Sequence, residues 1–227
     1  YTRDQIIKAA LRKCRAYDLD GGAPEPYQIR DAAEALNLIV KALHVHGTLL
    51  WSRSEKELRL AKNKSTYTVG PNGDLATTRP IRIHNPRWRD ITTKEDIPID
   101  LKGRDDFNNL TNKFSTGRPS WAFYDRKIAE AEIRVWPVPE DSKGKLIFTA
   151  DIPLQDFDAS GDDAHMPSYA YRFCVWALAG DLAPEYGIPL PERAEFKFEA
   201  KEAREELLDF EEDSEGLQMV PDTSYRV

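Results

Sequence analysis

The stretch that decides the fold is residues 26–60, PYQIRDAAEALNLIVKALHVHGTLLWSRSEKELRL. Up to residue 46 its apolar residues recur every three or four positions, which is the period of one face of a helix. That face consists of Ile29, Ala32, Ala33, Leu36, Val40 and Leu43. Gly47 follows where such a helix would end. From Leu58 to Leu60 apolar and charged residues alternate instead, as in a half-buried strand. The chain therefore changes from helix to strand near Trp51.

Helical periods recur on both sides of this change, towards the two ends of the chain. Residues 2–17 predict a first helix, and a Gly-containing turn separates it from the helix over 26–46. Residues 166–183 predict a third helix that is apolar around most of its circumference, which indicates burial between other elements. Residues 191–210 predict a fourth helix with a narrow apolar seam. The seam consists of Phe196, Ala200, Ala203, Leu207 and Phe210.

The middle of the chain has the alternation that is typical of short strands. Alternating runs occur at 58–60, 67–69, 81–83, 97–99, 121–125, 132–136 and 145–150. Turn residues separate them at 70–74, 84–86 and 101–103, and residues 138–144 are expected to close a hairpin. One short helix is expected at 105–114.

These patterns predict an α+β fold in which a β-rich insertion interrupts a helical bundle. The two N-terminal and two C-terminal helices, within residues 1–50 and 160–210, would form the bundle. Residues 51–159 would form the insertion, and residues 211–227 an extended C-terminal tail without periodicity.

Composition excludes several classes of protein. With 227 residues, 41% hydrophobic and 31% charged, the chain is too apolar for disorder. No stretch approaches the roughly 20 apolar residues of a membrane span, and the N-terminal residues lack the apolar region of a secretory signal. We therefore expect a protein that originates in the cytosol. The net charge of −7 argues against a protein that grips DNA phosphates, since that requires clustered Lys and Arg.

No catalytic, cofactor-binding or metal-binding residues are predicted. Cys14 and Cys174 lie among apolar residues and are expected to be buried thiols. His44 and His46 are two positions apart, so on a helix they point in different directions and do not chelate a metal together.

The most reactive-looking stretch is Ser160 to His165. Asp162 and Asp163 beside His165 would suit calcium binding or acid–base chemistry. Because they precede the start of a helix, where negative charge is favourable, we interpret them as a loop.

Aromatic and arginine residues are interleaved in the strand-rich region. Arg87, Trp88 and Arg89 form a locally basic stretch that we expect in a turn. Such residues serve as anchors in subunit interfaces or as a surface that faces nucleic acid. The interface interpretation is favoured.

The order of several short motifs resembles that of the tail accessory, or packaged-DNA stabilisation, proteins of short-tailed bacteriophages and of related head-to-tail adaptors. The motifs are Ile6–Lys13, Ala35–Lys41, Gly47–Trp51, Tyr67–Asp74, Arg79–Ile83, Gly117–Pro119, Trp136–Pro139, Leu154–Asp158 and Leu178–Gly187.

The resemblance implies a structural protein rather than an enzyme, with no cofactor. It implies a homo-oligomeric ring of twelve copies under the portal protein, which extends the DNA channel, retains packaged DNA and docks a downstream tail or nozzle protein. Double-stranded DNA would pass nearby without sequence-specific contacts, no membrane would be involved, and the location would be the virion neck after assembly in the host cytoplasm.

The C-terminal tail adds a hypothesis about the partner. Leu217, Met219, Val220 and Tyr225 are apolar residues in a segment without periodicity, so we expect them to become ordered on docking to the portal.

Two other functions stay open. The strand-rich region with its Trp and Arg residues would suit a carbohydrate- or protein-binding module. The stretch with Asp162, Asp163 and His165 would suit a hydrolase, which is the weaker of the two.

Overall fold

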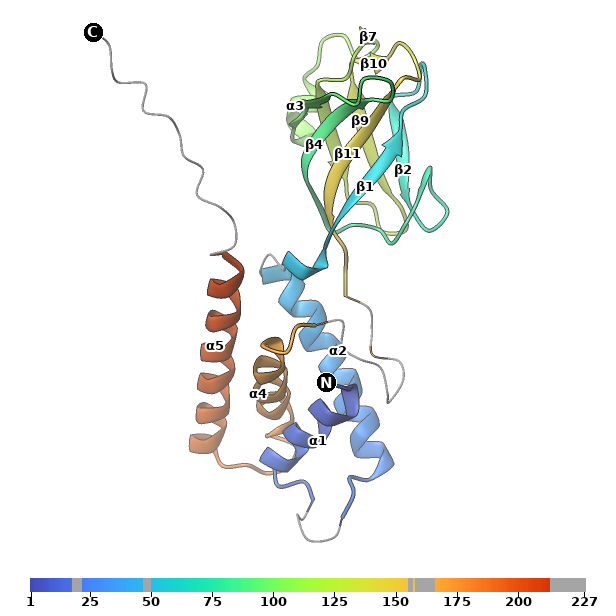
Figure 1. The fold of residues 1–227 in the computed structure, drawn as a ribbon. Coiled ribbons are helices and arrows are strands. Elements are labelled where there is room, and N and C mark those ends of the chain that lie inside the picture. Colours follow the sequence, from blue (N-terminus) through green and yellow to red (C-terminus); the bar gives the residue numbers. More distant parts are fainter. Residues whose placement is uncertain (18–21, 47–49, 155–156, 158–165, 213–227) are drawn as a thin grey trace, which may run out of the picture. The chain divides into compact units, whose positions relative to one another are not determined.

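The chain divides into two compact units (Figure 1). The computed structural model describes residues 1–17, 22–46, 50–154, 157 and 166–212. One unit comprises Tyr1–Trp51 with Leu154–Val227, and the other comprises Ser52–Pro153. We name them the helical unit and the β unit. The predicted α+β class is confirmed, with 37% helix and 28% strand.

Four long helices make up the helical unit. They are α1 (Arg3–Lys13), α2 (Pro26–His46), α4 (Ala170–Leu182) and α5 (Leu190–Glu212). The predicted helices over 26–46 and 191–210 correspond to α2 and α5. The first and third predicted helices are shorter than expected, because α1 ends at Lys13 and α4 begins at Ala170.

The early end of α1 has a local cause. Arg15 adopts a left-handed backbone conformation with φ of 55°. The amide of Ala16 then donates to the carbonyl of Leu11 at 3.0 Å, and the amide of Arg15 donates to that of Arg12 at 3.1 Å. This pair of bonds is the Schellman motif, which satisfies the last carbonyls of a helix. Glycine usually occupies the left-handed position that follows a helix. Because arginine stands there in this chain, the sequence gives no sign that α1 ends at Lys13.

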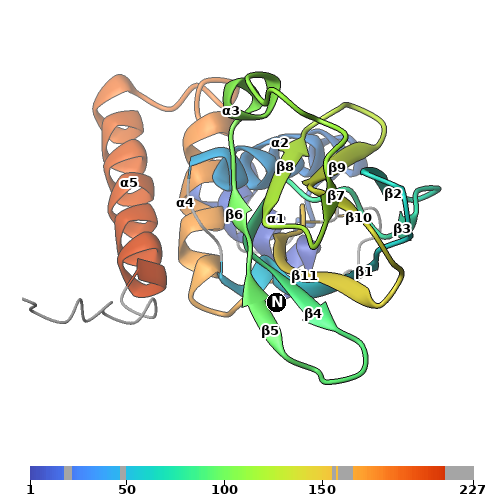
Figure 2. The ribbon, with the colours of Figure 1, turned by 90° about the horizontal axis from the view of Figure 1, so that it is seen from above.

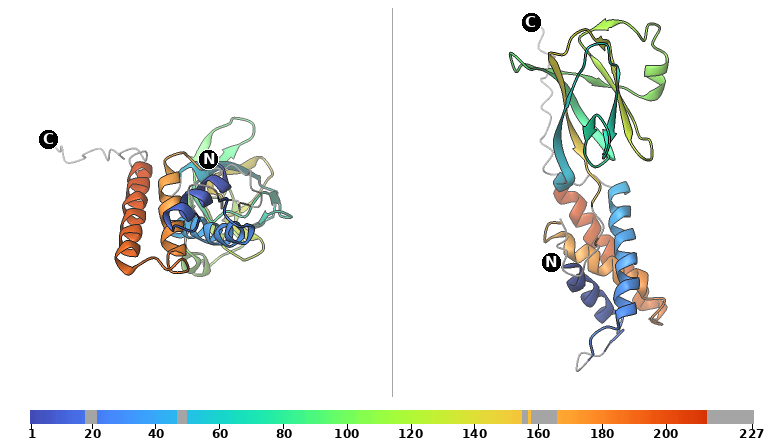
Figure 3. Two further views of the ribbon diagram at one scale, coloured as in Figure 1. Left: turned by 90° about the horizontal axis from the view of Figure 1, so that it is seen from below. Right: turned by 90° about the vertical axis from the view of Figure 1, so that its right-hand side faces the viewer.

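Helix α4 is the centre of the helical unit. In three views it lies between α5 and the pair formed by α1 and α2 (Figures 1, 2 and 3). Its buried residues are Ala170, Phe173, Cys174, Val175, Leu178, Ala179, Gly180 and Leu182. The predicted burial of this helix on most sides is therefore confirmed.

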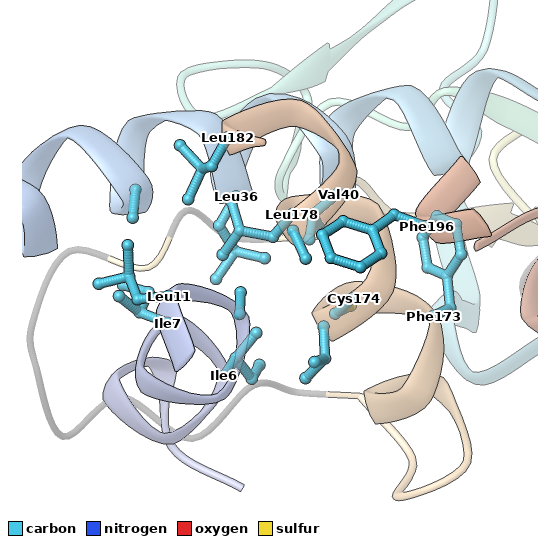
Figure 4. Packing of buried hydrophobic residues seen from close by; sticks show 14 of the residues in the cluster. Ile6, Ile7, Leu11, Leu36, Val40, Phe173, Cys174, Leu178, Leu182 and Phe196 are labelled. Atoms are coloured by element: carbon cyan, nitrogen blue, oxygen red, sulfur yellow. The ribbon is translucent and has the colours of Figure 1, made fainter. Parts of the chain in front are cut away.

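The core around α4 receives side chains from every long helix (Figure 4). Ile6, Ile7 and Leu11 come from α1, Leu36 and Val40 from α2, and Phe196 from α5. A fully buried side chain of this size contributes about 1.5–3 kcal/mol to the free energy of unfolding. The core therefore depends on all four helices at once.

Helix α5 packs against α4 through the predicted seam. Phe196, Ala203 and Leu207 are buried on this side. Around the seam, Arg172 of α4 lies 3.0 Å from Glu199, 3.2 Å from Glu202 and 2.8 Å from Glu206. These ion pairs are partly exposed and contribute little each, so the apolar seam is the main attachment.

The β unit consists mainly of two sheets. The first has the order β1 (Arg53–Arg59), β11 (Gly144–Asp151), β4 (Arg82–Asp90) and β5 (Asp96–Pro98), all antiparallel. The second has the order β3 (Leu75–Ala76), β2 (Thr66–Gly70), β9 (Ala131–Trp136), β8 (Trp121–Asp125) and β6 (Asp100–Leu101). The short 3-10 helix Leu50–Ser52 spans the boundary between the two units in the chain and leads into β1. The smaller elements of the β unit are helix α3 (Arg104–Asn108) and the parallel pair β7 (Thr116–Gly117) and β10 (Val138–Pro139).

The two sheets share one core. Leu146 and Phe148 of β11 belong to the same buried cluster as Tyr67 of β2 and Ile133 and Val135 of β9. Burial alternates along β9, as expected for a strand with one face in the core. Figure 3 shows the strands of this unit from the side.

The predicted hairpin at 138–144 is wrong. Strand β9 pairs with β2 and β8, whereas β11 pairs with β1 and β4, so the two strands belong to different sheets. Between them Val138 and Pro139 pair with Thr116 and Gly117. Pro137 and Pro139 lack the backbone donors of a regular ladder, which disfavours a direct hairpin at this place.

Two further local predictions are corrected. The expected turn at 84–86 lies inside β4, where Asn85 has a φ of 46° and the register with β11 shifts between Ile147 and Thr149. Such a bulge places turn-forming residues within a strand. The expected helix at 105–114 is only the short α3, which ends at Asn108.

Gly144 offers a test of the packing in the β unit. A Cβ at this position would lie 2.0 Å from Nε1 of Trp88. We expect Gly144→Ala to lower the free energy of unfolding by about 1–3 kcal/mol, because a rigid ring has to move. Urea unfolding monitored by circular dichroism measures the change. Gly103→Ala is the matched control, since a Cβ at residue 103 would lie no closer than 3.6 Å to another atom. An equal loss of stability in both variants would contradict the clash with Trp88 as the cause.

Candidate functional site

Arg87 and Arg89 lie in β4 and not in the expected turn. The side chains at alternate positions of a strand share one face, so both arginines lie on the same side of the sheet. Arg87 pairs with Glu55 of β1 and lies 3.0 Å from Asp96 of β5. Arg89 makes a bidentate pair with Asp96 at 2.5 and 2.6 Å.

These contacts belong to a charge ladder across the first sheet. It consists of Glu55, Glu57, Lys145, Arg87, Arg89 and Asp96. The hydrogen bond from Arg89 holds the pKa of Asp96 below its usual value, and the bond from Lys145 does the same for the pKa of Glu57. Three cations match three carboxylates, so the ladder is neutral and does not form a free basic patch.

Trp88 points to the opposite face. It packs against the buried cluster of the β unit, and the guanidinium of Arg118 lies 5.8 Å from the centre of its ring. The three residues predicted as one cluster are therefore separated by the strand, with two arginines on the ladder and the tryptophan against the core.

A different cationic site lies elsewhere in the β unit. A hollow of about 520 Å³ opens where β4 meets β6, α3 and β8. Its lining includes four cationic residues and one carboxylate, namely Arg82, Lys102, Arg104, Arg126 and Asp125. His84, Phe123 and Tyr124 complete its walls. We name it the cationic hollow. Sequence reasoning missed it because strands and loops far apart in the chain supply its residues.

The two units differ in charge. The β unit has 19 Lys and Arg residues against 15 Asp and Glu residues, whereas the remainder of the chain has 13 against 24. The acidic balance of the whole chain therefore belongs to the helical unit, and the β unit is mildly basic. This separation was not predicted from the overall charge.

In the helical unit the outer helices expose large apolar side chains. On α2, Tyr27 is 58% exposed and Leu38 68%. On α5, Leu190 is 77% exposed and Phe198 63%. Helix α5 lies on one side of α4 and α2 on another (Figure 2). Two different helices of this unit thus each expose two large apolar side chains.

The described residues show no group of three or more His, Cys, Asp or Glu that could hold a metal ion. Among those residues no helix is long and apolar enough to cross a membrane. Cys14 and Cys174 are buried, as predicted, and burial raises the pKa of Cys14 to about 11 and that of Cys174 to about 12. Such thiols stay protonated and are poor nucleophiles.

Several predicted residues lie outside the described part of the chain. They are the tail residues Leu217, Met219, Val220 and Tyr225, and the loop residues Asp162, Asp163 and His165. His44 and His46 lie at the end of α2, and their side chains are not described.

Neither the protein-family models nor the curated proteins contain a match to this chain.

In the turn after β2 the carboxylate of Asp74 accepts hydrogen bonds from the backbone and from a lysine. The backbone amide of Thr68 donates to Oδ2 of Asp74 at 2.9 Å. Lys64 binds the other oxygen at 2.5 Å. These two bonds, Lys64 first, hold the pKa of Asp74 below its usual value. The predicted turn at 70–74 is confirmed.

Asp74 therefore links stability to pH. Its pKa is lower in the folded protein than in the unfolded chain, so its contribution is present at neutral pH and is lost as the pH falls through the folded value. We expect Asp74→Asn to lower the free energy of unfolding by about 1 kcal/mol at pH 7, with the difference lost as the pH falls through the lowered pKa of the folded protein.

Urea unfolding at a series of pH values measures this difference. Glu140→Gln is the control, because Glu140 is exposed and has no hydrogen bond or ion pair with a described residue. A deficit of Asp74→Asn that stays constant down to pH 2 would rule out the ionised carboxylate as its cause.

Proposed function

We propose that this chain is a structural ring subunit, a head-to-tail adaptor that joins the portal of a tailed bacteriophage to its tail. The observation that carries the proposal is the exposure of large apolar side chains on two different helices, Tyr27 and Leu38 on α2 and Leu190 and Phe198 on α5. A subunit of a closed ring contacts one neighbour with one surface and the other neighbour with a different surface. Exposed apolar anchors on two outer helices suit that requirement.

In this proposal α2 of one copy packs against α5 of the next. Tyr27 and Leu38 lie eleven residues apart on α2, and Leu190 and Phe198 lie eight apart on α5, so each pair lies on one side of its helix. Lys201 and Glu205 continue the outer side of α5 with an exposed ion pair.

The remaining features of the proposal follow from the resemblance. The four long helices act as one bundle with the β unit as its insertion, twelve copies close the ring, and the C-terminal tail docks on the portal. The acidic helical unit suits a channel for DNA, since a negative wall repels the duplex and lets it slide. The role is structural, without catalysis or a cofactor, and the place is the virion neck.

The β unit supports a second candidate, a protein-binding module. Its basic balance and the cationic hollow would suit an acidic partner. This function is compatible with an adaptor, which has to hold a downstream tail component.

The ring is tested with one substitution on each of the two helices, α2 and α5. We expect Leu38→Glu and Phe198→Glu each to abolish ring formation on the cognate portal, because each buries an unpaired charge in the contact. Electron microscopy and mass photometry count the copies bound. Ile128→Glu is the control, since Ile128 is 97% exposed but lies in the β unit.

Mixing the two variants distinguishes the two kinds of contact. In a head-to-tail contact, the intact α2 of Phe198→Glu meets the intact α5 of Leu38→Glu, and the dimer stops there because both outer surfaces are damaged. Sedimentation of the mixture is expected to show a dimer that neither variant forms alone. Rings formed by both variants on the portal would refute the proposed contact.

The tail is tested by deletion. Removal of residues 213–227 is expected to leave the circular dichroism and melting of the chain unchanged and to abolish binding to the portal. The apolar residues Leu217, Met219, Val220 and Tyr225 would no longer be available for burial. A fourfold Ser variant at these positions separates loss of apolar contact from loss of length. Undiminished portal binding of both variants would exclude the tail as the docking segment.

A further inference from the structure

The cationic hollow is lined by more cationic side chains than carboxylates. Arg104 is neutralised, because its Nη2 binds Oδ1 of the buried Asp125 at 2.5 Å. Lys102 lies 3.3 Å from Asp100. These two cations therefore already have carboxylate partners.

Arg82 and Arg126 have no such partner. Both are exposed and both line the hollow. Among the residues that the structure describes, neither guanidinium forms a hydrogen bond or an ion pair. They come from different segments of the β unit, since Arg82 begins β4 and Arg126 directly follows β8. The hollow thus presents two free forked donors from two sides.

The walls beneath these arginines are held in place. The hydroxyl of Tyr124 donates to the carbonyl of Pro80 at 2.6 Å, and the guanidinium of Arg104 lies 5.5 Å from the centre of the Phe123 ring. His84 binds Asp151 at 2.8 Å, and Arg53 binds the same carboxylate at 3.3 Å. A ligand therefore meets a preformed surface and orders few side chains when it binds.

We propose that the cationic hollow binds the carboxylates of an acidic polypeptide segment of a partner protein. A guanidinium donates two parallel hydrogen bonds to a carboxylate, and such charge-assisted pairs are stronger than neutral ones. Arg82 and Arg126 each bind one carboxylate in this way. The hollow has room for acidic side chains between them, and the β unit is mildly basic around it. This inference does not rest on ring formation.

Nucleic acid fits the site less well. Phe123 is 6% exposed, so its ring does not offer a free face for stacked bases. Tight binding of duplex DNA requires many phosphate contacts along an extended basic surface. Here two free arginines lie in a hollow, and the nearby α3 carries Asp105 and Asp106 in its first turn.

The test uses a fluorescein-labelled hexaglutamate peptide and the full chain. Fluorescence anisotropy is expected to show saturable binding that weakens as NaCl is raised. Arg82→Gln and Arg126→Gln should each raise the dissociation constant by about tenfold, and the double variant by more, because each removes one charge-assisted pair. Circular dichroism melts confirm that the variants are folded.

Arg59→Gln is the matched control. Arg59 is also an exposed arginine of the β unit without a hydrogen bond or ion pair among the described residues, but it lies outside the hollow. Its variant should bind within about twofold of the unaltered chain, since salt screens distant surface charges. An equal loss for Arg59→Gln would show diffuse attraction and overturn the proposal, as would absence of hexaglutamate binding.

Oligonucleotides test nucleic acid as the alternative ligand of the cationic hollow. A single-stranded and a double-stranded oligonucleotide are measured in the same buffer. Tighter binding of either one, with the same dependence on Arg82 and Arg126, would overturn the polypeptide assignment in favour of a phosphate ligand.

Discussion

The helical unit depends on the burial of α4. Leu178, Cys174 and Ala179 of this helix have no exposed surface, and α1, α2 and α5 all pack on it. None of those three helices is apolar around its whole circumference, so each keeps an outer side for other purposes. Because α4 fills the centre of the core, Leu38 of α2 and Phe198 of α5 stay exposed while their helices remain packed.

The second organising feature is the separation of charge between the units. The helical unit concentrates acidic residues, many of them on α5, where Glu199, Glu202 and Glu206 are gathered by Arg172. The β unit balances its charges differently. Its first sheet carries a neutral ladder, while the cationic hollow retains two arginines without carboxylate partners. The helical unit thus exposes apolar side chains, whereas the β unit exposes cationic ones.

Sequence reasoning succeeded where structure follows from local periodicity. Helix α2 and the strands β8, β9 and β11 have apolar patterns that identify them directly, and the continuous apolar surface of α4 indicated its burial. It failed where the partner is distant. The hairpin at 138–144 was expected because neighbouring strands often pair, but β11 lies between β1 and β4. The end of α1 depends on Arg15, whose left-handed conformation is uncommon for arginine, and the bulge in β4 places Asn85 inside a strand although asparagine is typical of turns.

The same limit applies to the candidate site. Arg87 and Arg89 were visible as a basic stretch, yet their neutralisation by Glu55 and Asp96 depends on strands that are remote in the chain. Arg82 and Arg126 were two of several arginines interleaved with aromatic residues in the sequence, and what sets them apart is that neither has a partner among the residues that the structure describes. A charge becomes a binding group through what the fold leaves unpaired, and no linear pattern records that.

The β unit begins and ends on neighbouring strands. Arg53 of β1 is paired with Asp151 of β11, and the amide of Ile152 donates to the carbonyl of Ser52 at 3.0 Å. Paired positions of antiparallel strands are only about 5 Å apart, which is a gap that a short turn can span. A segment with adjoining ends can be gained, lost or exchanged in a single genetic event while the helices on either side keep their core. Homologous chains are therefore expected to vary most in this unit, and an unrelated domain with adjoining termini is expected to be accepted in its place.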